Sequence, residues 1–275
     1  MTMPPPPIVR VPNWIFSSHG AQSQTRVVPE ETPIAITYGR NTHAVMLATP
    51  ADLEDFAIGF SLGEDLIKTA DDIKALEIVQ SELGIELRMD LSDDDLTNYS
   101  RRRRALVGPT GCGLCGLESL SEVSKPLAKV ESEICLSRST ITSVMQSLFP
   151  AQELNHKTRA MHAAGFWSPS YGMMAVREDV GRHNALDKLV GVLARRNIAG
   201  RSGVVAITSR VSVEMVQKTA RLGAAVLVAV SAPTALAIRT AEACGITMIA
   251  GVRGDEFEIF THPDRIDLKE TTIAN

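Results

Sequence analysis

From residue 160 onward, short β-branched runs alternate with segments of helical periodicity, and this alternation constrains the fold more than any other feature of the sequence. The runs have the composition of buried strands. They are 161–166 (MHAAGF), 172–176 (GMMAV), 203–207 (GVVAI), 225–230 (AVLVAV), 246–252 (ITMIAGV) and 256–260 (EFEIF). Helices are expected at 184–195, 213–222 and 234–244, each followed by a glycine suited to a helix end, namely Gly200, Gly223 and Gly245. The alternation predicts an α/β fold with a largely parallel sheet and helices on its faces.

The residues before this region predict a small α+β domain at 21–100. Thr49 is expected to cap a helix with Pro50 at its first position, because this pair precedes apolar residues at helical spacing. The expected elements are hairpin strands at 34–38 and 44–47, the helix toward Leu66, and strands at 74–80 and 85–91.

Three further segments complete the predicted domain organisation. Residues 1–20 mix prolines with polar residues without sustained periodicity, and predict a flexible lead. Residues 101–130 form an arginine-rich and cysteine-containing connection. The α/β domain occupies 131–275, and its first clear helix is expected at 140–149.

Composition and charge exclude several classes of protein. The 275 residues include 28 Lys and Arg against 32 Asp and Glu, a net charge of −4 that argues against broad nucleic-acid binding. The longest uncharged stretch, 222–238, is interrupted by Pro233, and the N-terminus lacks an apolar signal-peptide core. Four cysteines are too few for a disulfide scaffold. We therefore expect a cytoplasmic protein that binds neither nucleic acid nor membrane.

Cys112 and Cys115 form a C-x-x-C pair in the glycine-rich segment 108–116 (GPTGCGLCG), which is expected to be an exposed, mobile loop. Nearby glycine amides and four arginines at 101–104 favour a reactive thiolate. A zinc site would need two more ligands, and Cys135 and Cys244 are far away in sequence. A thioredoxin-like pair would sit between a strand and a helix. A sulfur carrier fits this mobile segment, and two unreactive loop cysteines remain an alternative.

Three turns between a strand and a helix form a second candidate site. They span 177–188, 208–212 and 231–234, and in a parallel sheet such turns meet at one edge, beside helix N-termini. Free amides at these turns would suit phosphate groups. His162 reads equally well as a core residue or a site residue. The side chains predicted to take part are Arg182, His183, Ser209, Arg210 and Ser231.

Six segments, in this order, resemble the FdhD family of formate dehydrogenase accessory sulfurtransferases: GCGLCG, HAAG, EDVGRHNALDK, TSRVSVEMVQK, SAPTALAI and THPDRI. The resemblance extends from about Pro33 to Ile266. It implies a cytidine-deaminase-like mixed sheet flanked by helices, with a small α+β N-terminal domain. Zinc deaminases themselves use H-x-E and P-C-x-x-C. That chemistry is disfavoured, because Pro109 precedes Cys112 by three residues and no histidine has a glutamate two positions later.

The resemblance also implies a function. Members of the family take sulfur as a persulfide from a cysteine desulfurase and pass it to the molybdenum of the bis-molybdopterin guanine dinucleotide cofactor, on which formate dehydrogenase activity depends. By similarity, Cys112 would carry the persulfide with Cys115 as its partner, and no zinc is expected. The family's cofactor-binding segment would fall on Gly251, Val252, Arg253, Gly254, Asp255 and Glu256.

The implied partners are a cysteine desulfurase and the catalytic subunit of formate dehydrogenase, and the sequence leaves a homodimer open. The alternative function is a chaperone that shelters and delivers the molybdenum cofactor without carrying sulfur.

Overall fold

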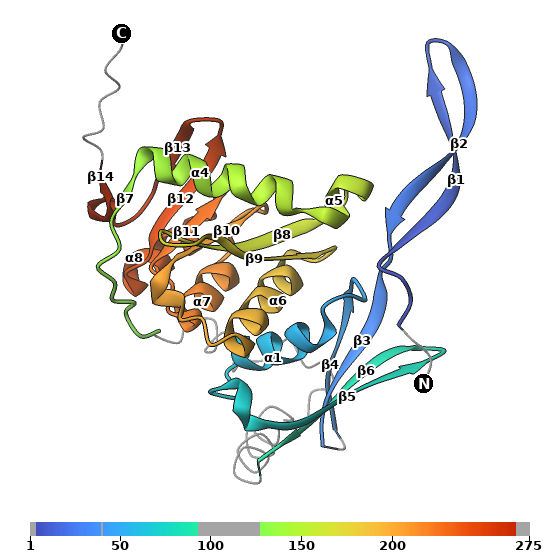
Figure 1. Cartoon of the computed structure of the whole chain (residues 1–275), viewed down its shortest axis with the longest axis horizontal. Coiled ribbons are helices and arrows are strands. Elements are labelled where there is room, and N and C mark those ends of the chain that lie inside the picture. Colours follow the sequence, from blue (N-terminus) through green and yellow to red (C-terminus); the bar gives the residue numbers. More distant parts are fainter. Residues whose placement is uncertain (1–3, 40, 93–126, 268–275) are drawn as a thin grey trace.

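The structure is a computed structural model that describes residues 4–39, 41–92 and 127–267 (Figure 1). Its largest sheet has the strand order β13-β12-β11-β10-β8-β9, made of β8 (His162–Ser168), β9 (Gly172–Asp179), β10 (Val204–Ile207), β11 (Val226–Ala229), β12 (Thr247–Arg253) and β13 (Glu256–Ile259). One face is covered by α6 (Arg182–Arg195), α7 (Val213–Leu222) and α8 (Ala235–Cys244), and the other by α4 (Arg138–Leu148) (Figure 1). The strands and helices expected in this half of the chain are confirmed to within a few residues.

The large sheet is mixed. The pairs β10–β11 and β11–β12 are parallel, whereas β8, β9 and β13 join the sheet through antiparallel pairs. The expectation of a largely parallel sheet is therefore wrong for the strand pairs that involve β8 and β13. In β8–β9 and β12–β13, short turns join consecutive strands, and a short turn can connect only antiparallel neighbours. The mixed α/β architecture flanked by helices, which the family resemblance implied, is confirmed.

Two apolar cores lie on the two faces of this sheet. Val205 and Ile207 pack toward the face covered by α6, α7 and α8, whereas Val204 and Ala206 pack toward the face covered by α4. Successive side chains of a strand point to opposite faces. Since both faces are covered, all four residues of β10 are buried, which explains the continuous apolar runs in the sequence.

Two of the three predicted helix-ending glycines are confirmed. Gly223 and Gly245 follow α7 and α8 with φ angles of 78° and 72°, the left-handed conformation that glycine adopts without strain. The prediction for Gly200 is wrong, because the left-handed residue after α6 is Asn197, with φ 53°. Gly200 instead lies against another turn, where a Cβ would be 2.1 Å from the Leu222 carbonyl oxygen.

The N-terminal sheet has the order β4-β3-β6-β5 and buries one face against α1 (Leu53–Gly63). Its strands are β3 (Thr32–Tyr38), β4 (Asn41–Ala48), β5 (Ile73–Ser81) and β6 (Gly84–Leu91), which confirms the four strands expected here. Figure 1 shows α1 between this sheet and α6. The N-terminal sheet is thus joined to the large sheet through two packed helices.

The expected role of Thr49 as a helix cap is wrong, since α1 begins four residues later, at Leu53. The backbone amide of Thr49 donates to Asp179 Oδ2 (3.0 Å), and its hydroxyl accepts from the Val180 amide (3.2 Å). These contacts with β9 and the turn after it hold Thr49 outside the helix.

The flexible lead expected at 1–20 is also corrected by the structure. From residue 8 onward the chain forms a β-hairpin of β1 (Ile8–Ser17) and β2 (Gly20–Pro29), with ten cross-strand pairs. Figure 1 shows the hairpin projecting from the rest of the chain. This segment has no periodic pattern because both faces of the ribbon are largely exposed, so burial imposes no alternation of polar and apolar residues.

The remaining described elements are short. They are the strands β7 (Leu136–Ser137) and β14 (Ile266–Asp267), which pair in parallel, the helix α5 (Glu153–Thr158), and 3-10 turns at Ala70–Asp72, Phe149–Ala151, Gly200–Ser202 and Pro263–Arg265.

The packing of α1 against α6 is unusually close and carries buried ion pairs. A Cβ on Gly59 would lie 1.7 Å from the Asp187 carbonyl oxygen, and one on Gly191 would lie 1.8 Å from the Asp55 carbonyl oxygen. Only glycine permits this approach. Ion pairs that cross or flank the contact are Lys188–Asp179 (2.6 Å), Lys218–Asp187 (2.6 Å) and Arg177–Asp55 (2.7 Å).

Candidate functional site

Cys112 and Cys115 lie outside the described residues, so the part of the candidate site that the structure describes is the sheet edge. Strand β8 is antiparallel to both β9 and β10, and therefore β9 runs in the same direction as β10, β11 and β12. The carboxyl ends of these four strands lie at one edge. The three predicted turns follow the ends of β9, β10 and β11 and therefore share this edge, as the sequence predicted, and the segment 251–256 at the end of β12 lies at the same edge.

The turns after β10 and β11 are joined directly. Val211 and Pro233 form an isolated parallel bridge, in which the Val211 amide donates to the Ala232 carbonyl (3.3 Å) and the Thr234 amide donates to the Val211 carbonyl (3.0 Å). The Thr234 hydroxyl in turn accepts from the Ala237 amide and caps α8. This pairing fixes the two turns, and the first turns of α7 and α8 follow them.

The three predicted side chains on these two turns differ in how accessible they are to a ligand. Ser209 is buried, and its hydroxyl donates to the Arg210 carbonyl (3.0 Å). Ser231 is half-buried, while Arg210 is exposed. Within the described ranges, no hydrogen bond or ion pair engages the Arg210 guanidinium, so it is the best placed of the three to bind an anion.

The turn between β9 and α6 is fixed by a buried aspartate. Asp179 Oδ1 accepts from the Gly181 amide (2.7 Å) and from Asn184 Nδ2 (3.0 Å), while Oδ2 accepts from Lys188 Nζ (2.6 Å). These bonds set the position of Arg182, the first residue of α6, which is partly exposed at the edge. Asp179 therefore holds the turn that presents Arg182.

The structure gives His183 a partner that the sequence did not predict. Its Nε2 lies 2.6 Å from Glu214 Oε2, in the first turn of α7, and the close imidazole lowers the pKa of Glu214. The carboxylate competes with any anionic ligand for the imidazole. His183 thus links two helix N-termini and is a poorer candidate for phosphate binding than Arg182 or Arg210. No spacing rule relates Glu214 to His183, because the two strands that precede α6 and α7 are separated in the sheet by β8.

The sequence did not decide whether His162 is a core residue or a site residue. In the structure His162 lies at this edge, as the first residue of β8, opposite Asp179. It is half-buried. Burial and the nearby Arg182 charge lower the pKa of His162, which favours the neutral imidazole. A neutral imidazole can donate one hydrogen bond and accept another, so His162 offers both to a ligand at this edge.

The segment 251–256 ends β12 and forms the turn into β13. Gly251 and Gly254 have φ angles of 67° and 61° there, so both positions favour glycine. Val252 is buried, and among the six residues its side chain is the least accessible to a ligand. Arg138, at the start of α4, donates to the Asp255 carbonyl (3.1 Å) and lies 3.6 Å from the Asp255 carboxylate. Sequence reasoning missed Arg138, since it is 117 residues away from Asp255.

The predicted residues lie along one edge of the sheet, but they are too far apart for a single ligand group to contact them all. Arg182 follows β9 and Gly254 follows β12, and these two strands are four strand spacings apart in the sheet. At about 4.8 Å per spacing, this edge is roughly 19 Å long. A single phosphate could not reach both ends, whereas an extended dinucleotide could follow the edge.

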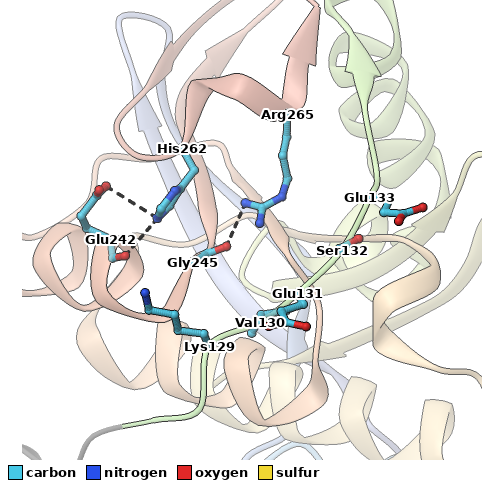
Figure 2. Close-up of a pocket in the computed structure, with 9 residues that line it drawn as sticks. All are labelled: Lys129, Val130, Glu131, Ser132, Glu133, Glu242, Gly245, His262 and Arg265. Carbon is cyan, nitrogen blue, oxygen red and sulfur yellow. Dashed lines mark hydrogen bonds and ion pairs between the residues drawn. The ribbon is translucent and has the colours of Figure 1, made fainter.

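The hollow that Figure 2 shows lies elsewhere. It has a volume of about 380 Å³, and Gly245, which ends α8 and precedes β12, lies in its wall, so the hollow is at the amino edge of the sheet. Arg265 donates to the Gly245 carbonyl (2.8 Å), and His262 Nε2 lies 2.9 Å from the Glu242 carbonyl. The two motif residues His262 and Arg265 thus tie the end of α8 to the following segment, away from the predicted cofactor edge.

Among the residues that the structure describes, no group of three or more His, Cys, Asp or Glu side chains is arranged to hold a metal ion. None of the helices in the described ranges is long and apolar enough to cross a membrane.

Comparison with known proteins places these features in one family. Residues 29–267 match the FdhD/NarQ family. The sulfur carrier protein FdhD of Agrobacterium fabrum is 53% identical over 246 residues, which cover 88% of this chain and 90% of the relative. The protein of the same name from Brucella abortus is 54% identical over 248 residues, covering 90% and 92%.

A solved structure agrees with this assignment. A crystal structure described as a formate dehydrogenase accessory protein from Desulfotalea psychrophila superimposes with a TM-score of 0.75 at 26% identity, covering 95% of this chain and all of the other. The family match spans most of the chain, and the relatives align over nearly their whole length. This chain therefore belongs to the FdhD/NarQ family.

Proposed function

We propose that this chain is a sulfur carrier that accepts persulfide sulfur from a cysteine desulfurase and delivers it to the molybdenum of the bis-molybdopterin guanine dinucleotide cofactor for formate dehydrogenase. The observation that carries the proposal is the C-x-x-C pair in a chain more than half identical to proteins named sulfur carriers. The structural relative described as a formate dehydrogenase accessory protein supports the destination of the sulfur.

The cysteine pair can both accept the sulfur atom and release it, and atoms and electrons balance in each step. The Cys112 thiolate attacks the outer sulfur of the donor persulfide, so a new S–S bond forms on Cys112 and the donor leaves as a thiolate. The Cys115 thiolate then attacks the inner sulfur of the Cys112 persulfide. A Cys112–Cys115 disulfide forms, and the outer sulfur leaves as sulfide toward the molybdenum. The two thiols supply the two electrons, and a dithiol reductant restores them for the next cycle.

The sheet edge supplies the features that a nucleotide cofactor needs. The N-termini of α6, α7 and α8 present backbone amides and the positive ends of helix dipoles, which favour anions. Arg210 is exposed beside α7, and Arg182 is partly exposed at the start of α6. The roughly 19 Å edge suits an extended dinucleotide that acts as the substrate of sulfur delivery.

Persulfide loading can be measured directly by mass spectrometry. We expect incubation with a cysteine desulfurase and cysteine to add one sulfur atom to Cys112, identified on the peptide that contains residues 108–116, and a thiol reductant to remove it. The control is the desulfurase without cysteine. No added sulfur on this peptide, or sulfur found on Cys135 instead, would exclude the proposed carrier residue.

The Arg210→Ala variant is expected to bind GDP, used as a fragment of the cofactor, about ten- to a hundred-fold more weakly than the wild type. A charge-assisted hydrogen bond to phosphate contributes about 1.5–3 kcal/mol. Persulfide loading on Cys112 should not change. Calorimetric titration measures the affinity, and Arg201→Ala is the matched control, because Arg201 is an exposed arginine that precedes β10 at the opposite edge. Equal GDP affinity in the wild type and both variants would place the nucleotide elsewhere.

A further inference from the structure

His162 lies at the carboxyl edge of the large sheet, and its imidazole has no bonding partner in the part of the chain that the structure describes. It is half-buried, and it begins β8, the strand between β9 and β10. Neither ring nitrogen forms a hydrogen bond or an ion pair with a described residue. A half-buried polar group usually has a partner. This imidazole is therefore available to a ligand.

The direction of the His162 side chain follows from its neighbours. Ala163 belongs to the core on the α4 side of the sheet, and Ala164 to the core on the side of α6, α7 and α8. Because side chains alternate along a strand, His162 points to the same side as Ala164. Its cross-strand partner Asp179 points there too, since Asp179 bonds to Lys188 of α6. His162 therefore lies beside the start of α6.

The first turn of α6 offers hydrogen-bond donors to an anion at this place. The amides of Arg182, His183 and Asn184 begin the helix, so they have no carbonyl partner within it. The Arg182 guanidinium is partly exposed, and none of the described residues bonds to it. The helix is 14 residues long, and the positive end of its dipole favours negative charge. An imidazole, free amides and a guanidinium thus lie together at one helix end.

The charged groups around His162 favour a neutral imidazole in the absence of a ligand. Burial and the positive charge of Arg182 lower the pKa of His162, and His183 acts in the same direction, while Asp179 opposes them. The Asp179 carboxylate is already paired with Lys188 (2.6 Å). A phosphate beside Arg182 would offset the positive charge and favour the protonated imidazole.

Two more charged residues lie on the neighbouring turns. Glu214 of α7 is paired with His183 (2.6 Å), and Arg210 follows β10. Glu214 would repel a phosphate, so the first turn of α6 is a better place for one than the first turn of α7. Arg210 would add positive charge on the other side of β8.

We propose that His162 binds a phosphate group of the ligand at the first turn of α6, and that its imidazole takes up one proton from solvent as the phosphate binds. The inference rests on the proposed function, because the phosphate is taken to belong to the nucleotide part of the cofactor. A protonated imidazole donates from both ring nitrogens, and a charge-assisted hydrogen bond to phosphate is stronger than a neutral one. No covalent bond forms or breaks.

The direction of the pH dependence follows. Without a ligand, His162 is neutral above its lowered pKa, and a bound phosphate raises that pKa. Between the two values GDP binding takes up a proton. The affinity for GDP should therefore increase as the pH falls through this range, by at most about tenfold per pH unit for one proton. Above both values, His162 contributes no pH dependence.

Calorimetry of the full chain measures the proton uptake. Titrations with GDP at about pH 7, in buffers of different ionisation enthalpy, give the number of protons bound per nucleotide. We expect the wild type to take up more protons than the His162→Gln variant, because glutamine can donate a hydrogen bond but does not titrate. The nucleotide's own titration is the same for both proteins. The matched control is His156→Gln, at an exposed histidine of α5, which should behave as the wild type.

Proton NMR of the His162 ring tests the same point in the wild-type chain, without a variant that could fail to fold. The pKa of His162 should lie below its ordinary value without a ligand, and should rise when GDP is added. Inorganic phosphate should also raise it, whereas guanosine, which has no phosphate, should not. This comparison separates binding of the phosphate from binding of the base.

The outcomes separate this inference from the proposed function. An unchanged His162 pKa on GDP binding, or equal proton uptake by the wild type and His162→Gln, would overturn the inference and leave the nucleotide edge standing. A rise caused by guanosine as large as that caused by GDP would also overturn it. If Arg182→Ala and Arg210→Ala both left the affinity for GDP unchanged, the proposed nucleotide edge would fail, and the inference with it. Persulfide loading on Cys112 is measured separately.

Discussion

The Cys112→Ala variant is expected to leave apo-formate dehydrogenase without activity while it binds GDP as tightly as the wild type. Alanine has no thiolate, so no persulfide can form at this position, and Cys115 alone cannot both hold the sulfur and release it as sulfide. The measurement is formate-dependent dye reduction by apo-enzyme incubated with the molybdenum cofactor, the desulfurase and each variant. The proposed edge for GDP does not involve Cys112, so nucleotide affinity should not change.

Cys135→Ala is the matched control for that experiment, because Cys135 is an exposed cysteine outside the C-x-x-C pair. It should activate formate dehydrogenase fully. If a variant that lacks both Cys112 and Cys115 also activates the enzyme fully, the chain delivers the cofactor without carrying sulfur, and the chaperone alternative holds. Loss of activity together with loss of GDP binding would instead indicate that the substitution damaged the fold.

The fold could be predicted from the sequence wherever burial imposes a pattern. The strands β10 and β11 are covered on both faces, so their residues are uniformly apolar, and the helices between them follow from periodicity and from Gly223 and Gly245. The hairpin of β1 and β2 could not be predicted, because its two faces are largely exposed and its residues carry no such pattern. The start of α1 was misplaced because contacts with Asp179, 130 residues away, override the local preference at Thr49.

The candidate site could be predicted at the level of topology but not of side-chain partners. Strand-to-helix turns must lie at strand ends, so the shared edge of Arg182 and Arg210 followed from the order of elements. The contacts His183–Glu214 and Arg138–Asp255 depend on how separate turns face one another, which no local spacing encodes.

The segment EDVGRHNALDK shows how a motif can combine two roles. Of its polar residues, Asp179, Asn184 and Lys188 are buried and bond to one another or to the N-terminal unit, whereas Arg182 is partly exposed at the edge. Asn184 Nδ2 also donates to the Leu47 carbonyl (2.9 Å). Most of this segment therefore joins β4 to the large sheet, and only its middle is available for a ligand.

The Lys188→Met variant is expected to lose about 3–5 kcal/mol of unfolding free energy, which is the usual result of removing one partner of a buried ion pair. Lys188 and Asp179 are both fully buried, and Lys188 Nζ bonds to Asp179 Oδ2 (2.6 Å) and to the Thr49 carbonyl (2.9 Å). Methionine has a similar length, so the packing is largely kept while the Asp179 carboxylate loses its counter-charge. Thermal unfolding should show a drop in Tm of roughly 6–20 °C.

The matched control for Lys188→Met is Lys68→Met, which removes another lysine from a pair with an aspartate, Asp65, at an exposed site. Exposed pairs contribute little, because water solvates both charges whether or not they meet, so its Tm should stay within experimental error of the wild type. The Lys188 variant should also bind GDP more weakly, since Asp179 fixes the turn that presents Arg182. A Tm shift no larger than that of the Lys68 variant would show that the pair does not hold the N-terminal unit to the sheet.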